Sequence, residues 1–371
     1  MDEPLLLTPG PITTSPETKQ AMGRDWGSRD HAFIRLTRRV RDRLLDLAGG
    51  GGEYTCVLVQ GSGTFVVEAA LGTLVPRDGK ALVLINGEYG RRIRRILEII
   101  GRDHTTLETP EDSPNDIAAL DSALASDPAI THVIAVHCET TSGILNPLEA
   151  VAEVVARRGR RLLIDAMSAF GAIPLDAKAI TFEAVMASSN KCLEGVPGIG
   201  FAIVRKDALE AANGNAHSLS LDLHEQWRGF QSNGQWRFTP PTHVLAALDA
   251  ALDQHQAEGG VAGRAARYAA NCACLLEGMR ALGFETLLAA DLQAPIIVTF
   301  HMPKDPRFAF DAFYDGLRSK GFAIYPGKLT DVPSFRIGCI GRVEPADIRA
   351  ALTAVESTLN EMGLTAGAGA G

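Results

Sequence analysis

From residue 56 onward, short apolar runs alternate with longer stretches in which apolar residues recur every three or four positions. Short apolar runs are typical of buried strands, and the longer period is typical of amphipathic helices. The runs predict strands at Cys56–Val59, Ala81–Ile85, His132–Val136, Arg161–Ile164, Ala184–Ala187 and Gly200–Val204. The stretches between them predict helices at Thr64–Leu74, Arg91–Ile100, Asn115–Ala125, Pro147–Arg157 and His243–Gln256. Strands separated by helices indicate βαβ units, so the sequence predicts an α/β fold with a mostly parallel sheet.

The pattern changes along the chain and predicts four segments. Four prolines and little periodicity predict an extended arm over residues 1–19, and helical spacing at Arg35–Leu47 lies in a large domain over residues 20–257. A Glu-Gly-Gly interruption begins a smaller α+β domain over residues 258–364. Its predicted elements are helices at Val261–Leu282, Asp311–Lys320 and Pro345–Leu359 and strands at Pro295–His301 and Phe335–Gly338. The Gly/Ala-rich tail, residues 365–371, is predicted to be disordered.

Composition and charge exclude several classes of protein. The 371 residues are 46% hydrophobic and 22% charged, which is ordinary for a globular protein and excludes a mainly disordered chain. The formal net charge of −8 argues against general nucleic-acid binding and against binding to anionic membranes. The N-terminus begins with acidic residues and has a short apolar run, so we predict neither a signal peptide nor a membrane span.

The cysteines give no sign of a metal site. The six cysteines form no C-x-x-C pair and no zinc spacing, and several lie inside apolar runs. Cysteines in such runs usually pack as small hydrophobic residues. We therefore predict no metal, no disulfide framework and a reducing, cytoplasmic location.

A glycine-containing segment, Gln60-Gly61-Ser62-Gly63-Thr64, joins a predicted strand to a predicted helix. Glycines let the backbone approach a ligand closely, and the start of a helix offers free N–H groups to an anion. The segment matches neither the dinucleotide fingerprint nor the P-loop pattern. Taken alone, it is equally compatible with an ordinary turn in which a hydroxyl caps the helix.

An acid and a lysine follow two successive predicted strands. Asp165 ends an apolar strand, and Lys191 follows the next strand, 26 positions later. One βαβ unit takes about 30 residues, so both residues can lie at the carboxyl edge of the sheet, where such sheets bind ligands. Alone, Asp165 is also compatible with a helix cap and Lys191 with a solvated loop. Together with the glycine segment they indicate a pyridoxal phosphate site, in which the lysine forms a Schiff base and the acid pairs with the ring nitrogen.

From Leu5 to about Leu359 the chain resembles the class V, fold-type I aminotransferases. Besides the segments above, the resemblance rests on Leu7-Thr8-Pro9-Gly10-Pro11, Asn86-Gly87-Glu88-Tyr89-Gly90, His137-Cys138-Glu139-Thr140-Thr141-Ser142-Gly143, Asp165-Ala166-Met167-Ser168, Ser189-Asn190-Lys191-Cys192 and Phe335-Arg336-Ile337-Gly338. Two stretches, at residues 218–223 and 237–243, are similar to a narrower branch that acts on an aminophosphonate.

The resemblance implies pyridoxal 5′-phosphate as the cofactor and a role for each matching residue. Lys191 would hold the cofactor and shuttle a proton, and Asp165 would keep the ring nitrogen protonated. Tyr89 would stack on the ring, using its large flat area. Thr140 would hydrogen-bond the ring hydroxyl.

The resemblance also implies how the anionic groups are bound. Ser62, Gly63 and Thr64 would bind the cofactor phosphate, with Thr242 contributed by the partner subunit of a homodimer. Arg336 would bind the acidic group of the substrates, with Gly10 and Pro11 beside it, since a planar guanidinium suits both carboxylate and phosphonate. The implied substrates are 2-aminoethylphosphonate and pyruvate.

Some alternatives stay open from the sequence. An alanine–glyoxylate or serine–pyruvate aminotransferase would keep the same cofactor site, and so would a pyridoxal phosphate lyase acting on a related aminophosphonate. Arg29 is compatible with a phosphonate contact or with the surface. We interpret the four arginines at positions 91, 92, 94 and 95 as a solvated helix face.

Overall fold

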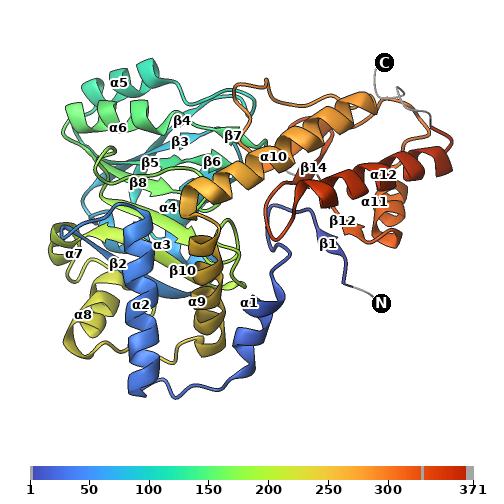
Figure 1. The fold of residues 1–371 in the computed structure, drawn as a ribbon. Coiled ribbons are helices and arrows are strands. Elements are labelled where there is room, and N and C mark those ends of the chain that lie inside the picture. Colours follow the sequence, from blue (N-terminus) through green and yellow to red (C-terminus); the bar gives the residue numbers. More distant parts are fainter. Residues whose placement is uncertain (1–2, 327–329, 365–371) are drawn as a thin grey trace.

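The computed structural model describes residues 3–326 and 330–364. At its centre lies a seven-stranded sheet with the order β2-β10-β9-β8-β5-β3-β4 (Figure 1). Only β10 runs antiparallel to its neighbours in this sheet, which confirms the predicted mostly parallel arrangement. The strands are β2 Tyr54–Gly61, β3 Lys80–Ile85, β4 Asp103–Glu108, β5 Ile130–Val136, β8 Arg161–Asp165, β9 Ala184–Ser188 and β10 Gly198–Arg205.

Helices cover the sheet so that its central strands are buried on both faces. In β5, β8 and β9 nearly every side chain is buried, which explains why they appear in the sequence as continuous apolar runs. Helices α2 and α3 both pack on β2, and α4 packs on β3. The helices of this part are α2 His31–Leu47, α3 Gly63–Leu74, α4 Glu88–Ile99, α5 Ile117–Ser126, α6 Leu148–Arg157, α7 Lys206–Ala211, α8 Leu223–Asn233 and α9 Thr242–Ala257.

The long helix α10, Gly260–Ala281, extends from this core to the C-terminal elements (Figure 1). There a three-stranded antiparallel sheet, in the order β11-β14-β13, packs with α11 and α12 around a separate apolar cluster. Phe335 lies at the centre of that cluster, and its ring centroid is 5.5 Å from those of Phe284 and Phe313. The elements are β11 Ile297–His301, α11 Phe310–Ser319, β13 Tyr325–Pro326, β14 Ser334–Gly338 and α12 Pro345–Glu361. The exact domain boundaries stay a prediction.

The N-terminal segment is only partly the extended arm that the sequence predicts. β1, Leu5–Leu6, pairs in parallel with β12, Phe322–Ala323, of the C-terminal part. Pro16–Gln20 then forms the short helix α1, so the prediction of an extended arm is wrong there. The side chain of Ser15 accepts a hydrogen bond from the N–H of Thr18, a local cap that the long-range apolar pattern does not reveal.

Several other elements escape the sequence pattern because they are short or polar. They are β4, α7, α8, the 3-10 turn Ala21–Gly23 and the small hairpin of β6 Cys138–Glu139 and β7 Ile144–Leu145. The tail at residues 365–371, predicted to be disordered, lies outside the described residues. Within residues 3–326 and 330–364, no helix is both long and apolar enough to cross a membrane.

We expect the central strands to dominate stability. Ile164 of β8 is fully buried, so Ile164→Ala should lower the free energy of unfolding by about 2–5 kcal/mol. Ile99 is 67% exposed, and the matched change Ile99→Ala should cost less than about 0.5 kcal/mol. Urea-induced unfolding of both variants measures the difference. Similar losses in the two variants would contradict this assignment of the core.

Candidate active site

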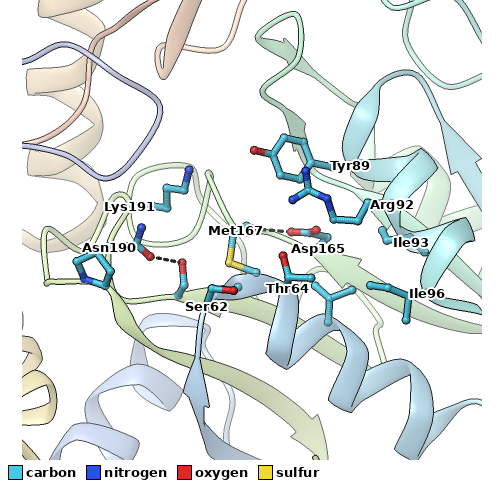
Figure 2. A pocket seen from close by; sticks show the side chains of 14 residues that line it. Ser62, Thr64, Tyr89, Arg92, Ile93, Ile96, Asp165, Met167, Asn190 and Lys191 are labelled. Atoms are coloured by element: carbon cyan, nitrogen blue, oxygen red, sulfur yellow. Dashed lines mark hydrogen bonds between the residues drawn. The ribbon is translucent and has the colours of Figure 1, made fainter. Parts of the chain in front are cut away.

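A pocket opens where strands β8 and β9 end and helices α3 and α4 begin (Figure 2). Its cavity volume is about 170 Å³. The lining includes six of the sequence-predicted site residues, namely Ser62, Gly63, Thr64, Tyr89, Asp165 and Lys191. β8 and β9 are neighbours, and Asp165 and Lys191 line the same pocket. The prediction that both residues lie at one edge of the sheet is therefore confirmed.

Asp165 ends β8 and is almost completely buried. Its carboxylate accepts a hydrogen bond of 2.9 Å from the backbone N–H of Met167. Burial raises the pKa of Asp165 to about 6, and that N–H, Lys191 and Arg92 all act against the rise. The carboxylate therefore needs a cation in the pocket to stay fully ionised in a site removed from water.

Lys191 follows β9 and lines the same pocket as Asp165 (Figure 2). Burial lowers the pKa of Lys191 to about 8, although the charge of Asp165 favours its protonated form. Its Nζ donates a hydrogen bond to the carbonyl of Pro9 in the N-terminal arm. A Cβ on Gly10 would lie 2.7 Å from that Nζ, so the arm closes over the lysine at a position that only glycine fits.

Tyr89 lies in the first turn of α4, which is held by a buried carboxylate. Glu139 accepts hydrogen bonds from the backbone N–H groups of Tyr89 at 3.1 Å and of Gly90 at 3.4 Å. The hydroxyl of Thr141 donates to the same carboxylate at 2.7 Å. A negative group at a helix N-terminus is favourable, so these contacts fix the start of α4 and with it Tyr89.

Arg336 and Thr140 lie together, outside the residues that line the pocket. Arg336 is 1% exposed, and its Nη1 donates to the carbonyl of Thr140 at 2.6 Å. Its Nη2 donates to the carbonyl of Pro326 at 3.3 Å, and Tyr325 lies against the guanidinium. The buried Nε has no hydrogen-bond partner among the described residues, which leaves a donor for an anion.

The comparison with protein families agrees with this arrangement. A family model described as aminotransferase class-V matches residues 17–336. The chain belongs to the class-V aminotransferase family.

This class-V aminotransferase has a similar relative along nearly its whole length. It is 58% identical, over 359 residues, to a 2-aminoethylphosphonate--pyruvate transaminase of Pseudomonas aeruginosa, with 97% of each chain covered. In structure it is similar to pyridoxamine-pyruvate aminotransferase from Mesorhizobium loti, with a TM-score of 0.90 at 26% identity over 100% of this chain and 96% of the other. Alanine--glyoxylate aminotransferase from Nostoc sp. has a TM-score of 0.90 at 24% identity, covering 97% and 96%, and shows the shared fold-type I architecture alone.

Some predicted site residues of this class-V aminotransferase lie apart from the pocket lining. Gly10 and Pro11 belong to the arm above Lys191. Thr242 begins α9, and its hydroxyl contacts only its neighbour His243 among the described residues. Arg29 is exposed and does not line the pocket.

The pocket also contains residues that the sequence reasoning missed, Arg92 above all. Its guanidinium lies 4.8 Å from the ring centroid of Tyr89, and its charge favours ionised Asp165. The interpretation of the whole arginine cluster as a solvated face is therefore wrong for Arg92. The sequence could have indicated Arg92, because it lies three positions after Tyr89, which was already a candidate, and residues three apart on a helix share a face. The other lining residues are Val67, Ile93, Ile96, Met167, Ser188, Asn190 and Pro197.

The effect of the neighbouring charges on the pKa of Lys191 can be tested with two variants. Removing the carboxylate in Asp165→Asn takes away an interaction that favours protonated Lys191, so the pKa of Lys191 should fall below about 8. Arg336→Met should raise it, because that cation disfavours protonation. Acetylation of Lys191 against pH, followed by peptide mass spectrometry on protein freed of bound small molecules, measures both shifts. Exposed Lys178 is the internal reference. Equal midpoints in all three proteins would contradict the coupling.

Proposed function

We propose that this chain is a pyridoxal-phosphate-dependent aminotransferase that transfers the amino group of 2-aminoethylphosphonate to pyruvate. The products are phosphonoacetaldehyde and L-alanine. One observation carries the proposal: a lysine and a carboxylate line the same pocket, together with the start of helix α3. The 58% identity to the Pseudomonas aeruginosa enzyme supports the choice of substrates.

The residues at the rim fit the phosphate of the cofactor. Ser62 is the N-cap of α3, yet its side chain makes no capping hydrogen bond, so its hydroxyl is available to a ligand. A Cβ on Gly63 would lie 2.4 Å from the sulfur of Met167, so a larger residue there would have to displace that side chain. Ser62, Gly63 and Thr64 would hold the phosphate, using hydroxyls and the free N–H groups of the helix start.

The residues deeper in the pocket fit a flat, cationic ring. When bound, pyridoxal phosphate supplies an aldehyde carbon that takes up the amino group and a ring that accepts electrons. Asp165 would pair with the ring nitrogen, whose positive charge offsets the cost of burying the carboxylate. Tyr89 would cover one face of the ring. Thr140 would bind the ring hydroxyl.

Lys191 would hold the cofactor and then move the proton. Its pKa of about 8 leaves a usable fraction of neutral amine near neutral pH, which is the form that attacks a carbon or accepts a proton. The lysine would take a proton from the carbon bearing the amino group and return one on the cofactor side. The arm at Pro9 and Gly10 excludes water from this side of the amine.

Arg336 would bind the acid group of each substrate in turn. The donor carries a phosphonate and the acceptor a carboxylate, and a guanidinium can donate to either through two parallel hydrogen bonds. Its unpaired Nε supports such a contact. One arginine can therefore serve both halves of the reaction.

A homodimer would complete the phosphate site. Phe65 and Phe238 are 50% and 49% exposed and line a second groove that includes Gly61, beside the phosphate cradle. Exposed aromatic residues of this size around one groove are typical of a protein interface. Thr242 lies outside the pocket of its own chain, which supports its contribution to the pocket of the other subunit.

The first test follows the cofactor absorbance while 2-aminoethylphosphonate is added without a keto acid. We expect the band to bleach and pyruvate to restore it. Lys191→Ala should lose the response and at least about 10²–10⁴-fold in rate, the usual range for a proton-transfer group. Exposed Lys178→Ala is the matched control and should behave like the wild type.

Each other outcome favours a different reaction. A band that ignores 2-aminoethylphosphonate but bleaches with L-alanine or L-serine would replace the substrate. Turnover of an aminophosphonate without pyruvate would indicate a lyase. The absence of any band after addition of pyridoxal phosphate would overturn the assignment of Lys191.

The shared site gives a second test. Phe238→Asp should yield a monomer in analytical ultracentrifugation and weaken pyridoxal phosphate binding by at least about tenfold, since a hydrogen bond to a charged group contributes about 1.5–3 kcal/mol. Thr242→Ala should weaken binding similarly while the dimer persists. A wild-type monomer, or a Thr242→Ala variant with unchanged affinity, would contradict the shared site.

A further inference from the structure

The turn that carries Lys191 ends in an unusual backbone conformation. The N–H of Glu194 donates to the carbonyl of Lys191 at 2.9 Å, which closes the turn. Glu194 has φ of +58°, and it is the one residue other than glycine with a positive φ in the described part of the chain. A residue with a Cβ is disfavoured there and persists only where its surroundings hold it. The position of Lys191 therefore depends on what holds Glu194.

Three side chains of α10 hold the carboxylate of Glu194, which is 3% exposed. The hydroxyl of Tyr268 and Nη2 of Arg267 each donate to it at 2.6 Å. Arg264 lies 3.4 Å away and also donates to the carbonyl of Cys192, inside the same turn. Burying a carboxylate without such partners would cost a large desolvation free energy. The charge of Glu194 therefore holds this turn against α10.

Tyr268 and Arg267 also contact the segment that directly follows β14, the strand that carries Arg336. The Tyr268 hydroxyl accepts a hydrogen bond of 3.2 Å from the N–H of Gly341, three residues after β14 ends. Arg267 donates to the carbonyls of Gly341 at 2.6 Å and Val343 at 2.9 Å. One hydroxyl thus connects the lysine turn to the segment behind Arg336.

We propose that Glu194 is a positioning residue that couples the turn carrying Lys191 to the strand carrying Arg336. The coupling runs through Tyr268 and Arg267 of α10. The inference rests on the proposed function, because the roles of the lysine and the arginine come from it. Glu194 itself is not among the residues that line the pocket. Glu194 would instead set the relative positions of the Lys191 amine and the Arg336 guanidinium.

The least disruptive test removes only the bridging hydroxyl. Tyr268→Phe keeps the ring and every charge but removes one of the two side-chain links between Glu194 and Gly341, leaving the one through Arg267. Tyr54→Phe is the matched control, because Tyr54 is also buried and its hydroxyl donates to the carbonyl of Phe182, away from the pocket lining. Thermal unfolding and circular dichroism of both variants establish that they are folded.

The decisive measurement is the dissociation constant of pyridoxal phosphate in two backgrounds. In the chain with Lys191, Tyr268→Phe should weaken binding by about two- to tenfold, the effect of one buried hydrogen bond. In a Lys191→Ala background the same change should have little effect, because the coupling acts through the lysine. Tyr268→Phe should also raise the KM for pyruvate by a similar factor, whereas Tyr54→Phe should change neither quantity.

A second pair of variants, which removes a buried charge, tests the carboxylate of Glu194 directly. Glu194→Gln should reproduce the Tyr268→Phe pattern more strongly, and Glu183→Gln, a buried acid paired with Arg161 and His132, should not. If Glu194→Gln does not fold, the comparison of Tyr268→Phe with Tyr54→Phe tests the proposal by itself.

The outcomes separate this inference from the proposed function. A wild type that binds no pyridoxal phosphate or does not transaminate would overturn the proposed function. A working wild type in which Tyr268→Phe matches Tyr54→Phe would overturn the coupling alone. Equal weakening in both lysine backgrounds would also overturn it, since the hydroxyl would then act without the lysine.

Discussion

The burial of Asp165 is the constraint on which the rest of the site depends. A carboxylate at the end of a central strand has almost no water around it, and among the described residues one backbone N–H, that of Met167, donates a hydrogen bond to it. Lys191 and Arg92 supply positive charge that favours its ionised form. The sheet provides the rigid edge, and the segments around it provide the opposite charges. A pocket built in this way favours a ligand that is cationic at one end and anionic at the other.

The second organising feature is that the groups near the pocket come from distant parts of the chain. The lysine turn, the arm, the segment at Thr140 and the strand with Arg336 meet through buried hydrogen bonds rather than through one continuous element. Polar contacts of this kind are specific in direction, so they fix geometry more strictly than apolar packing does. The large and small cores are separate clusters, and where these segments meet a third apolar cluster with Ile12, Cys192 and Ile340 packs beside the polar contacts.

Much of this could be predicted from the sequence, and the missing parts share a physical reason. The buried strands were predictable because burial on both faces leaves an uninterrupted apolar run, as at Leu162–Ile164. Asp165 and Lys191 were predictable because strand ends meet at one edge of a parallel sheet. Helix α1 and strand β4 were missed, since a local cap forms the first and the second is an edge strand with a polar sequence. The contacts of Glu194 with α10 span about 70 positions of the chain, and no local pattern encodes which arginine meets which acid.

The pairing of the N-terminal arm with the C-terminal part has a consequence for how the enzyme is made. Leu5 and Leu6 find their partners only when Phe322 and Ala323, far later in the chain, have been synthesised. Domains tend to fold as they emerge, so the large sheet can form well before the arm has anywhere to dock. Until then, Pro9 and Gly10 cannot cover Lys191. A nascent chain therefore carries an uncovered amine from the synthesis of Lys191 until Phe322 and Ala323 have been made.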